Sequence, residues 1–424
     1  MGSGSIYSPG MNRTAGIAGP AVSRLPVSGA TQKSYAGERL AYVPELDGLR
    51  AVAIGAVLLV HTMPTYFPGG FIGVDIFFVL SGYLITTILC REFEREHRVH
   101  LGDFYVRRAL RLMPALFAML GVYVSVMVVC RFFLADPIYV SDHALAVLSS
   151  ALYVMNWTAA FDIGTSGYLI HTWSLATELQ FYLLWPLTLM ALLRYTGRDS
   201  AWKVVLVLIL IVTGWRTLLV FEGASPKHVY ASLYTRIDSL LIGCLLVLAP
   251  LTRFQAAASR FSLFPVLLLV AMLMTLSWNS HRLQILGFTL IALCAAWIIL
   301  VALTGQADGV LRRILRSPLL NYCGRISYGF YLWHYPIYRV VAMHLSGEFE
   351  KLVATAGLTF AVAAVSYHVL ELPALRLGRR YRSGVKQRPD RFTSAASPPT
   401  AASPSQKSSD PISQRSSPCV RPAG

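Results

Sequence analysis

The most regular feature of the chain is the grouping of its apolar residues into blocks of roughly 20, separated by short polar segments. Clear blocks cover Trp202–Phe221, Phe261–Trp278, Gln284–Leu303 and Lys351–Leu370. A helix of about 20 apolar residues crosses the hydrocarbon core of a bilayer and satisfies its own backbone hydrogen bonds there. The pattern therefore predicts an all-α, polytopic membrane protein. Because the first block lies far from the N-terminus and others follow it, a cleaved secretory signal is not expected.

Composition and charge narrow this interpretation. The chain is 55% hydrophobic and only 14% charged, which is outside the range of ordinary soluble domains. Its net charge of +16 at pH 7 raises nucleic acid as a partner. However, the basic residues fall in particular loops between the apolar blocks, as the positive-inside rule predicts for a membrane protein. We expect membrane lipids as surroundings and no nucleic-acid partner.

The loop charges also predict a topology. Basic residues precede the first span, which we place at Leu49–Met63, so the N-terminus is expected in the cytoplasm. The second and third spans are expected at Phe71–Cys90 and Leu112–Leu134, joined by a strongly basic loop. The segment Ala144–Phe161 is ambiguous, but only if it stays on the outer face do the later basic loops lie inside. The charges then give about ten spans with both termini cytoplasmic.

Composition divides the chain into three parts. Residues 1–40 and 381–424 are rich in small residues, Ser and Pro without apolar periodicity, which predicts a disordered lead and a disordered cytoplasmic tail. Residues 41–380 form the expected membrane domain. The six cysteines are scattered and form no CxxC pair, so neither a disulfide framework nor a zinc site is indicated, and we expect no metal.

Charged and imidazole side chains inside a span are costly, so each is a candidate functional residue. Arg50 and His61 are eleven residues apart on the first span, which places them on one helical face about 16 Å apart. Asp75, Glu178 and Asp238 enter their spans from the same outer side as His61.

A His paired with a carboxylate such as Asp75 or Glu178 suits general base catalysis, and the same group suits nucleophilic catalysis through an acyl-imidazole. The alternative is a structural ion-pair network between helices, with Arg216 neutralising one of the acids. His334 either lines the substrate path or is a core residue bonded to a backbone carbonyl.

A second polar group lies at the predicted cytoplasmic end of the third span. Arg107, Arg108 and Arg111 stand there, with Arg50 and Arg325 expected at similar depth. Arg107 and Arg111 are four residues apart and share a helical face. Guanidinium groups suit phosphate oxygens, so a nucleotide-containing donor is one interpretation, and positive-inside anchoring is the other. The sequence has no P-loop and no dinucleotide fingerprint.

Seven blocks, in order, resemble the motifs of the acyltransferase-3 family of membrane O-acyltransferases. They are spread over roughly residues 42–376, nearly all of the expected membrane domain, and are Tyr42–Arg50 followed by His61, Gly70–Tyr83, Phe104–Pro114, Trp173–Glu178, Arg236–Gly243, Ile326–Pro336 and Leu370–Pro373.

The resemblance implies a ten-span fold in a bacterial inner membrane and an O-acetyltransferase that uses cytoplasmic acyl-CoA, commonly acetyl-CoA. The acceptor it implies is a hydroxyl of O-antigen, exopolysaccharide, peptidoglycan or another glycan. Carried over by motif, the catalytic residues are His61, Asp75 and Glu178. The expected substrate-binding residues are Arg50, Arg107, Arg108, Arg111, Ser81, Tyr83, Trp173, Arg236, Asp238 and His334.

Three other functions remain open from the sequence. Buried His and acidic residues also mark transporters or flippases of lipid-linked sugars, although the inverted repeats and paired broken spans of such carriers are not evident. A sensor or scaffold, and an acyltransferase acting on a small-molecule glycoside, are the others. Some family members carry a C-terminal hydrolase-like domain, whereas a low-complexity tail follows here. We therefore expect the short form, which completes the transfer itself or passes the acyl group to a separate partner.

Overall fold

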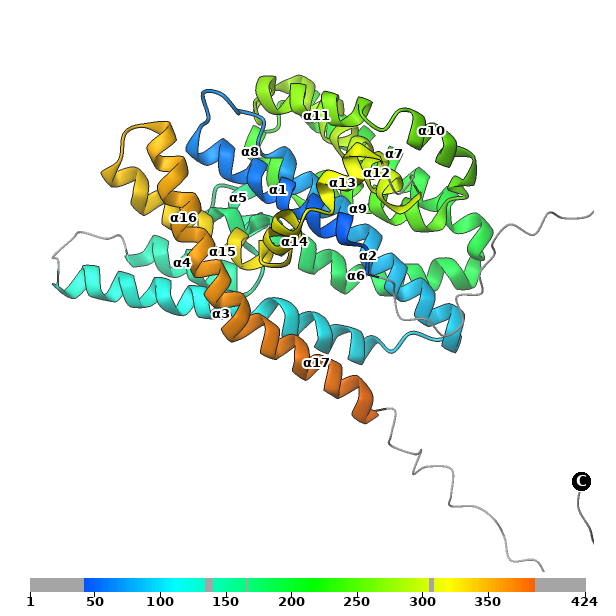
Figure 1. The fold of residues 1–424 in the computed structure, drawn as a ribbon, viewed down its shortest axis with the longest axis horizontal. Helices are drawn as coiled ribbons and strands as arrows, with labels where there is room; N and C mark the ends of the chain where they lie inside the picture. Colours follow the sequence, from blue (N-terminus) through cyan, green and yellow to red (C-terminus); the bar gives the residue numbers. More distant parts are fainter. Residues whose placement is uncertain (1–41, 134–139, 165–166, 305–308, 386–424) are drawn as a thin grey trace, which may run out of the picture. The chain divides into compact units, whose positions relative to one another are not determined.

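The computed structural model describes residues 42–133, 140–164, 167–304 and 309–385. Over these residues the regular structure is helical throughout (Figure 1). The predicted N-terminal lead lies outside the described residues, as does most of the predicted tail. Helix α17 (Leu372–Val385) continues past the tail boundary expected at residue 381. The longer helices are α1 (Pro44–Thr62), α2 (Ile72–Glu96), α3 (Leu101–Phe133), α6 (Trp173–Tyr195), α7 (Arg198–Phe221), α9 (Leu233–Leu248), α12 (Phe288–Thr304), α15 (Ser327–His344) and α16 (Glu348–Ser366).

Shorter helices connect or extend these. They are α4 (Val140–Ala151), α5 (Met155–Ala160), α8 (Pro226–Ala231), α10 (Gln255–Arg260), α11 (Phe264–Thr275), α13 (Val310–Leu315) and α14 (Pro318–Arg325). The 3-10 turns are η1 (Ile170–Thr172) and η2 (Leu251–Phe254), and the π-helical turns are η3 (Leu283–Gly287) and η4 (Tyr367–Glu371).

Seven helical segments among the described residues are long and apolar enough to cross a membrane. An eighth is added if α10 and α11, bent by 71° at their break, form one broken span. These helices make the chain a multi-pass membrane protein. Helices α1 and α15, with 19 and 18 residues, are also long enough but carry more polar side chains. Counting them as spans would give the ten expected from loop charge, a number that stays a prediction.

The ambiguous segment at Ala144–Phe161 forms the two short helices α4 and α5, of 12 and 6 residues. Neither has the length of about 20 residues that a bilayer requires. This agrees with the interpretation of a segment that does not cross.

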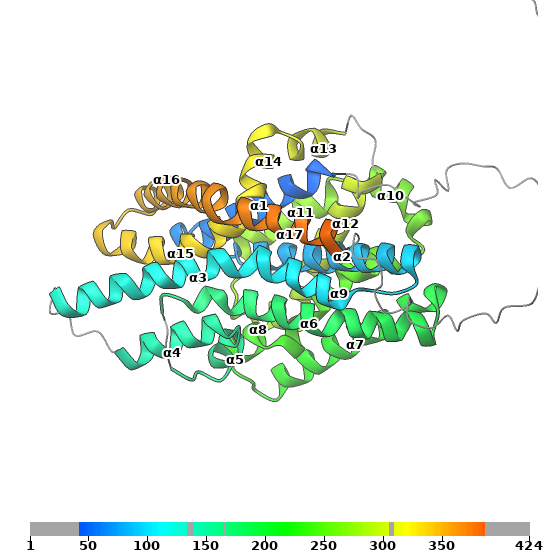
Figure 2. The same cartoon turned by 90° about the horizontal axis from the view of Figure 1, so that it is seen from below.

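Helix α2 lies at the centre of the described domain, packed against α1, α6, α9 and α12 (Figure 1). The most apolar stretch of α2 is 72% buried, whereas that of α7 is only 22% buried. The outer helices therefore expose apolar side chains to lipid, while α2 faces protein on most sides. Helix α17 runs beside α3 (Figure 2), along one edge of the helices in Figure 1.

Two glycines allow the close approach of α2 and α9. A Cβ atom at Gly82 would collide with the Leu240 carbonyl oxygen, and one at Gly243 would collide with the Val79 carbonyl oxygen. Small residues let helix backbones pack closely where no hydrophobic effect drives association within the membrane. This contact fixes the rotation of α2 and so decides where Asp75 and Ser81 point.

Candidate active site

Two of the cavities among the described helices contain most of the expected site residues. The first, which we call the arginine cavity, takes polar side chains from five helices. Its polar lining residues are Arg50 from α1, Ser81 from α2, Arg108 and Arg111 from α3, Ser174, Glu178 and Tyr182 from α6, and Ser327, Tyr328 and Tyr331 from α15. Among the charged groups that line it, three guanidinium groups face a single carboxylate, so the cavity favours an anion.

The arginines of this cavity are held by neighbouring side chains. Arg50 donates to Asp47 at 2.8 Å, one turn before it on α1. The Arg108 guanidinium lies over the Phe104 and Tyr182 rings, 5.7 and 5.4 Å from their centroids. Such packing orients the guanidinium while leaving its N–H donors available.

Helix α3 turns its arginines differently from the expectation. Arg108 and Arg111 line the cavity, whereas Arg107 lies 3.8 Å from Glu92 and is not among the lining residues. The predicted pairing of Arg107 with Arg111 is therefore replaced by Arg108 with Arg111. Both spacings share a helical face, so only the packing of α3 against neighbours such as α15 and α17 distinguishes them.

Glu178 belongs to the arginine cavity. Its Oε1 atom accepts hydrogen bonds from the Ser81 hydroxyl of α2 and from the Tyr182 hydroxyl one turn later on α6. Among the described residues, no hydrogen bond links Glu178 to His61. The expectation that Glu178 orients His61 therefore has no contact to support it.

The second cavity, which we call the histidine cavity, lies at the C-terminal end of α1. Its volume is about 320 Å³, and its lining includes His61, His171, Trp173, Lys227, Tyr230, Trp278 and Tyr335. The His61 ring has three aromatic neighbours from α15: His334, Tyr335 and Tyr338, with centroids 5.4, 4.8 and 5.7 Å away. Trp173 packs on Tyr230 at 4.8 Å between centroids. Indole and phenol surfaces of this kind suit the apolar faces of a sugar ring.

His171 is a cavity residue that sequence reasoning missed. It lies on η1, immediately before α6, with its ring 5.5 Å from that of His334 and 5.3 Å from that of Tyr335. The available signal was its position two residues before Trp173, at the edge of the recognised Trp173–Glu178 block.

The two cavities share Val74 of α2 and Tyr331 of α15 in their linings. The Tyr331 hydroxyl donates to the His171 carbonyl at 2.8 Å and lies 2.6 Å from the Ser174 hydroxyl. Its ring meets Phe77 edge-on at 6.3 Å. Tyr331 is thus fixed by hydrogen bonds as part of the wall between an arginine-lined space and an imidazole-lined one.

The expected contact between Asp75 and His61 is not formed. Asp75 instead accepts from Arg236 at 2.7 Å and from the Ser239 hydroxyl at 3.0 Å, and both ions of this pair are fully buried. The Arg236 guanidinium also lies 3.5 Å from the Phe288 ring centroid. The tight α2–α9 packing turns Asp75 toward α9, away from the end of α1.

Asp238 forms a second buried pair. Arg216 of α7 donates to it at 2.9 Å, and the Thr289 hydroxyl of α12 donates at 2.7 Å. This agrees with the expectation that Arg216 neutralises one of the acids. Neither Arg236 nor Asp238 lines either cavity, and Tyr83 does not line them either.

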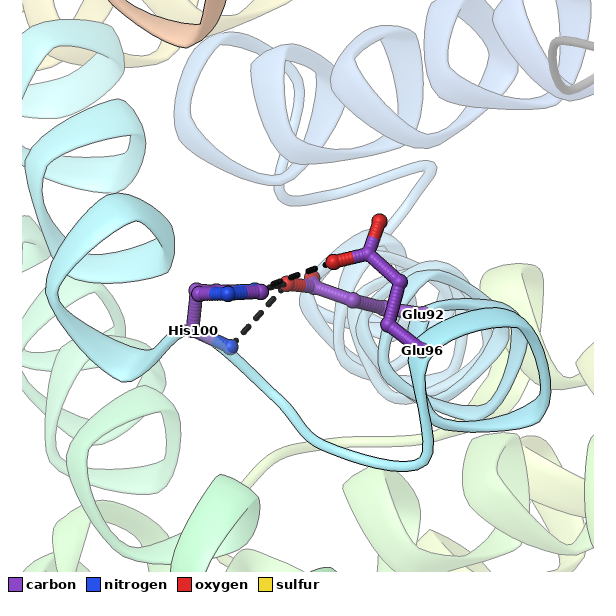
Figure 3. A group of neighbouring side chains, drawn as sticks. All are labelled: Glu92, Glu96 and His100. Atoms are coloured by element: carbon purple, nitrogen blue, oxygen red, sulfur yellow. Dashed lines mark hydrogen bonds and ion pairs between the residues drawn. The ribbon is translucent and has the colours of Figure 1, made fainter. Parts of the chain in front are cut away.

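One group among the described residues could offer three ligand atoms to a metal ion. The ligand atoms of Glu92, Glu96 and His100 lie within 4.8 Å of one another at the α2–α3 connection (Figure 3). The His100 imidazole is 3.0 Å from Glu92 and 3.3 Å from Glu96, and its backbone N–H donates to Glu92 at 3.0 Å. These hydrogen bonds account for the group as a link between two helices.

A model of the acyltransferase domain family matches residues 43–370, which contain both cavities and both buried ion pairs. This chain belongs to the acyltransferase family. The family match confirms the resemblance seen in the motifs, and it agrees with an all-helical membrane domain.

This chain is similar to several curated bacterial O-acetyltransferases. It is 33% identical over 355 residues to the peptidoglycan O-acetyltransferase OatA of Listeria monocytogenes and 34% identical over 364 residues to the putative peptidoglycan O-acetyltransferase YrhL of Bacillus subtilis. Each match covers 80% of this chain and 56% of the relative. The O-acetyltransferase OatA of Staphylococcus aureus is 30% identical over 355 residues, covering 80% of this chain and 58% of that protein. The chain thus spans somewhat more than half the length of these relatives. No solved structure is significantly similar to the acyltransferase.

Proposed function

We propose that this acyltransferase moves an acetyl group from acetyl-CoA to a hydroxyl of a cell-envelope carbohydrate at the bacterial cytoplasmic membrane. The observation that carries the proposal is the meeting of the two cavities at Val74 and Tyr331. One cavity has the guanidinium groups that an anionic donor requires, and the other has the imidazoles and aromatic rings that suit a sugar hydroxyl.

The donor is assigned to the arginine cavity by charge. Arg50, Arg108 and Arg111 present N–H donors that match the phosphate oxygens of coenzyme A. These residues adjoin the basic α2–α3 connection, which the positive-inside rule assigns to the cytoplasm, where acetyl-CoA is made. The thioester end would extend past Val74 and Tyr331 toward His61.

The reaction needs a base close to both cavities. In the proposed step, an imidazole nitrogen of His61 takes the proton of a sugar hydroxyl while the hydroxyl oxygen attacks the thioester carbonyl carbon. The carbon–sulfur bond then breaks and its electron pair leaves with the sulfur. The proton passes from His61 to that sulfur and gives the free thiol of coenzyme A. In the alternative route the His61 nitrogen attacks the thioester first and carries the acetyl group to the hydroxyl. Both routes yield one ester and one coenzyme A.

The relatives' names favour peptidoglycan as the acceptor, since those from Listeria monocytogenes and Bacillus subtilis are named for it. O-antigen, exopolysaccharide and a small-molecule glycoside are the competing acceptors, and a carrier for lipid-linked sugars is the competing function. The ester product separates all of these.

The test measures ester-linked acetate, released by mild base and quantified by mass spectrometry, in cells with wild-type protein, His61→Ala or a deletion. Peptidoglycan, exported polysaccharide and the small-molecule fraction are analysed separately. We expect acetyl esters on peptidoglycan with the wild type, and a decrease to the deletion level with His61→Ala at equal membrane abundance. Full acetylation with His61→Ala would overturn the role of His61. No protein-dependent ester in any fraction would overturn the acyltransferase proposal and favour the carrier.

A further inference from the structure

Three imidazoles from distant parts of the chain converge beside the histidine cavity. His61 ends α1, His171 lies on η1 and His334 lies on α15. The ring of His334 is 5.4 Å from that of His61 and 5.5 Å from that of His171, so His334 stands between them. His334 itself is completely buried and lines neither cavity.

The backbone fixes the tautomers of two of these rings. Nδ1 of His334 lies 2.6 Å from the Tyr331 carbonyl oxygen, and Nε2 of His171 lies 3.1 Å from the Leu332 carbonyl oxygen. A carbonyl oxygen only accepts, so each of these nitrogens carries a hydrogen. In the neutral rings, the other nitrogens are acceptors, namely Nε2 of His334 and Nδ1 of His171.

Both remaining nitrogens are buried, and neither has a hydrogen-bond partner among the described residues. An acceptor enclosed in this way normally finds a donor. For Nε2 of His334, the adjacent ring of His61 is a source of an N–H group. Ring nitrogens lie on the ring edge, so rings with centroids 5.4 Å apart can bring two nitrogens to about 3 Å by side-chain rotation.

We propose that His334 is the positioning residue of His61, with Nε2 of His334 accepting the ring N–H of His61. This hydrogen bond fixes the tautomer of His61 and leaves the other His61 nitrogen as a lone pair toward the histidine cavity. When His61 takes a proton from the substrate, the resulting imidazolium still donates its other N–H to Nε2 of His334. The catalytic role of this hydrogen bond rests on the proposed function, whereas the existence of the bond does not.

An imidazole is suited to this role because it is neutral. A carboxylate at the same place would require a counter-ion, as Asp75 and Asp238 have in Arg236 and Arg216. Asp75, one of the two carboxylates that the sequence offered as a partner for His61, is paired with Arg236. His334 performs the orientation without a second buried charge.

Two substitutions at His334 separate its nitrogens. His334→Asn keeps a donor near the Nδ1 position for the Tyr331 carbonyl but removes the acceptor at Nε2. His334→Gln places an amide oxygen near the Nε2 position and keeps an acceptor for His61. Tyr338→Phe is the matched control, because Tyr338 also contacts the His61 ring, at 5.7 Å, but offers it no ring nitrogen.

The primary readout is the rate at which diethyl pyrocarbonate modifies His61 in the purified full-length protein, followed by peptide mass spectrometry. This rate reports the nucleophilicity of the His61 nitrogen, and it can be measured without the protein's acyl-transfer activity. We expect about a fivefold slower modification in His334→Asn, and rates within about twofold of wild type in His334→Gln and Tyr338→Phe. In the transfer assay, His334→Asn should lower kcat at unchanged KM for acetyl-CoA, with partial recovery in His334→Gln.

Equal His61 modification in His334→Asn and wild type would overturn the proposal, as would an equal loss in the Asn and Gln variants. If His334→Asn does not fold, the wild type still decides the matter. With ¹⁵N-labelled histidine, a scalar coupling across the N–H···N bond should join His61 and His334, and its absence would refute the bond. Failure of acyl transfer in the wild type, with the coupling present, would instead count against the proposed function.

Discussion

Polar groups occupy two contrasting regions of this helical domain. Between α2 and α9, Asp75 and Arg236 form a pair that is 0% exposed, with Phe288 packed over the guanidinium. In the arginine cavity, Arg108 and Arg111 instead face open space among helices α1, α3, α6 and α15. Both regions contain charged side chains among the helices. Only in the arginine cavity are those side chains accessible to a ligand.

A charged residue inside a span is therefore not by that fact alone a catalytic residue. Asp75 and Asp238 each have a guanidinium within 2.9 Å, which pairs their charge inside the protein. His61 has no carboxylate partner among the described residues, yet it lines a cavity. Access to a cavity, more than depth in the membrane, separates the candidate catalytic groups from the structural ones.

The largest effect is expected from breaking a buried pair. Arg236→Met leaves the Asp75 carboxylate buried without its counter-ion, which typically costs about 3–5 kcal/mol. We expect a lower thermal midpoint in detergent and a strong decrease in folded protein, measured by fluorescence-detected size-exclusion chromatography after heating. His61→Ala is the control, because His61 lines the histidine cavity and belongs to no buried ion pair in the described residues. Its thermal midpoint should stay close to that of the wild type.

The double variant Asp75→Asn, Arg236→Gln sharpens this test. Because it removes both charges together, it should be more stable than Arg236→Met alone. A wild-type midpoint for Arg236→Met would show that the pair is not structural and would erase the contrast between the two regions.

An intermediate effect is expected in the arginine cavity. Arg108→Gln removes charge-assisted hydrogen bonds of about 1.5–3 kcal/mol to the proposed donor, so the KM for acetyl-CoA should rise at least about tenfold. The thermal midpoint should change little. Initial rates of thiol release by purified protein, at varied acetyl-CoA concentration, provide the measurement.

Arg107→Gln is the matched control on the same helix. Arg107 lies near Glu92 and outside the cavity, so its KM should stay within about twofold of the wild-type value. Equal increases in KM for the two variants would mean that the donor binds the whole basic surface of α3 and not the cavity.

The smallest effect is expected at the wall between the cavities. Tyr331→Leu removes part of that wall, so the preference for acetyl-CoA over butyryl-CoA, measured as the ratio of kcat/KM values, should fall several-fold. Tyr331→Phe keeps the ring and should retain the preference, although loss of the hydroxyl contacts with His171 and Ser174 costs about 1 kcal/mol of stability. An unchanged ratio in Tyr331→Leu would place the acyl chain elsewhere.

Much of the fold could be predicted from the sequence. Apolar blocks of bilayer length predicted membrane helices, and the structure has helices over those blocks, such as α7 and α12. Loop charge predicted that Ala144–Phe161 does not cross, and α4 and α5 are too short to do so. These features are local, because length and hydropathy decide them before any helix meets another.

The site was only partly predictable. The motifs contained His61, Arg108 and Glu178, and these residues line cavities. They did not indicate that Glu178 lies among the arginines or that His171 joins the histidine cavity. Whether these residues perform the roles assigned to them stays a prediction.

What the sequence determined by itself is the class of molecule: a helical membrane acyltransferase domain with polar residues at fixed positions along each helix. What the tertiary structure decided is which of those polar residues meet. Neighbouring residues on a helix point about 100° apart, so the rotation of α3 about its axis decides whether Arg107 or Arg108 faces a cavity. Contacts between distant segments set the rotation of each helix, as Gly82 of α2 against Leu240 of α9 does for α2. The packing of α2 against α9 directs Asp75 to Arg236, and the packing of α1 against α15 places His61 beside His334.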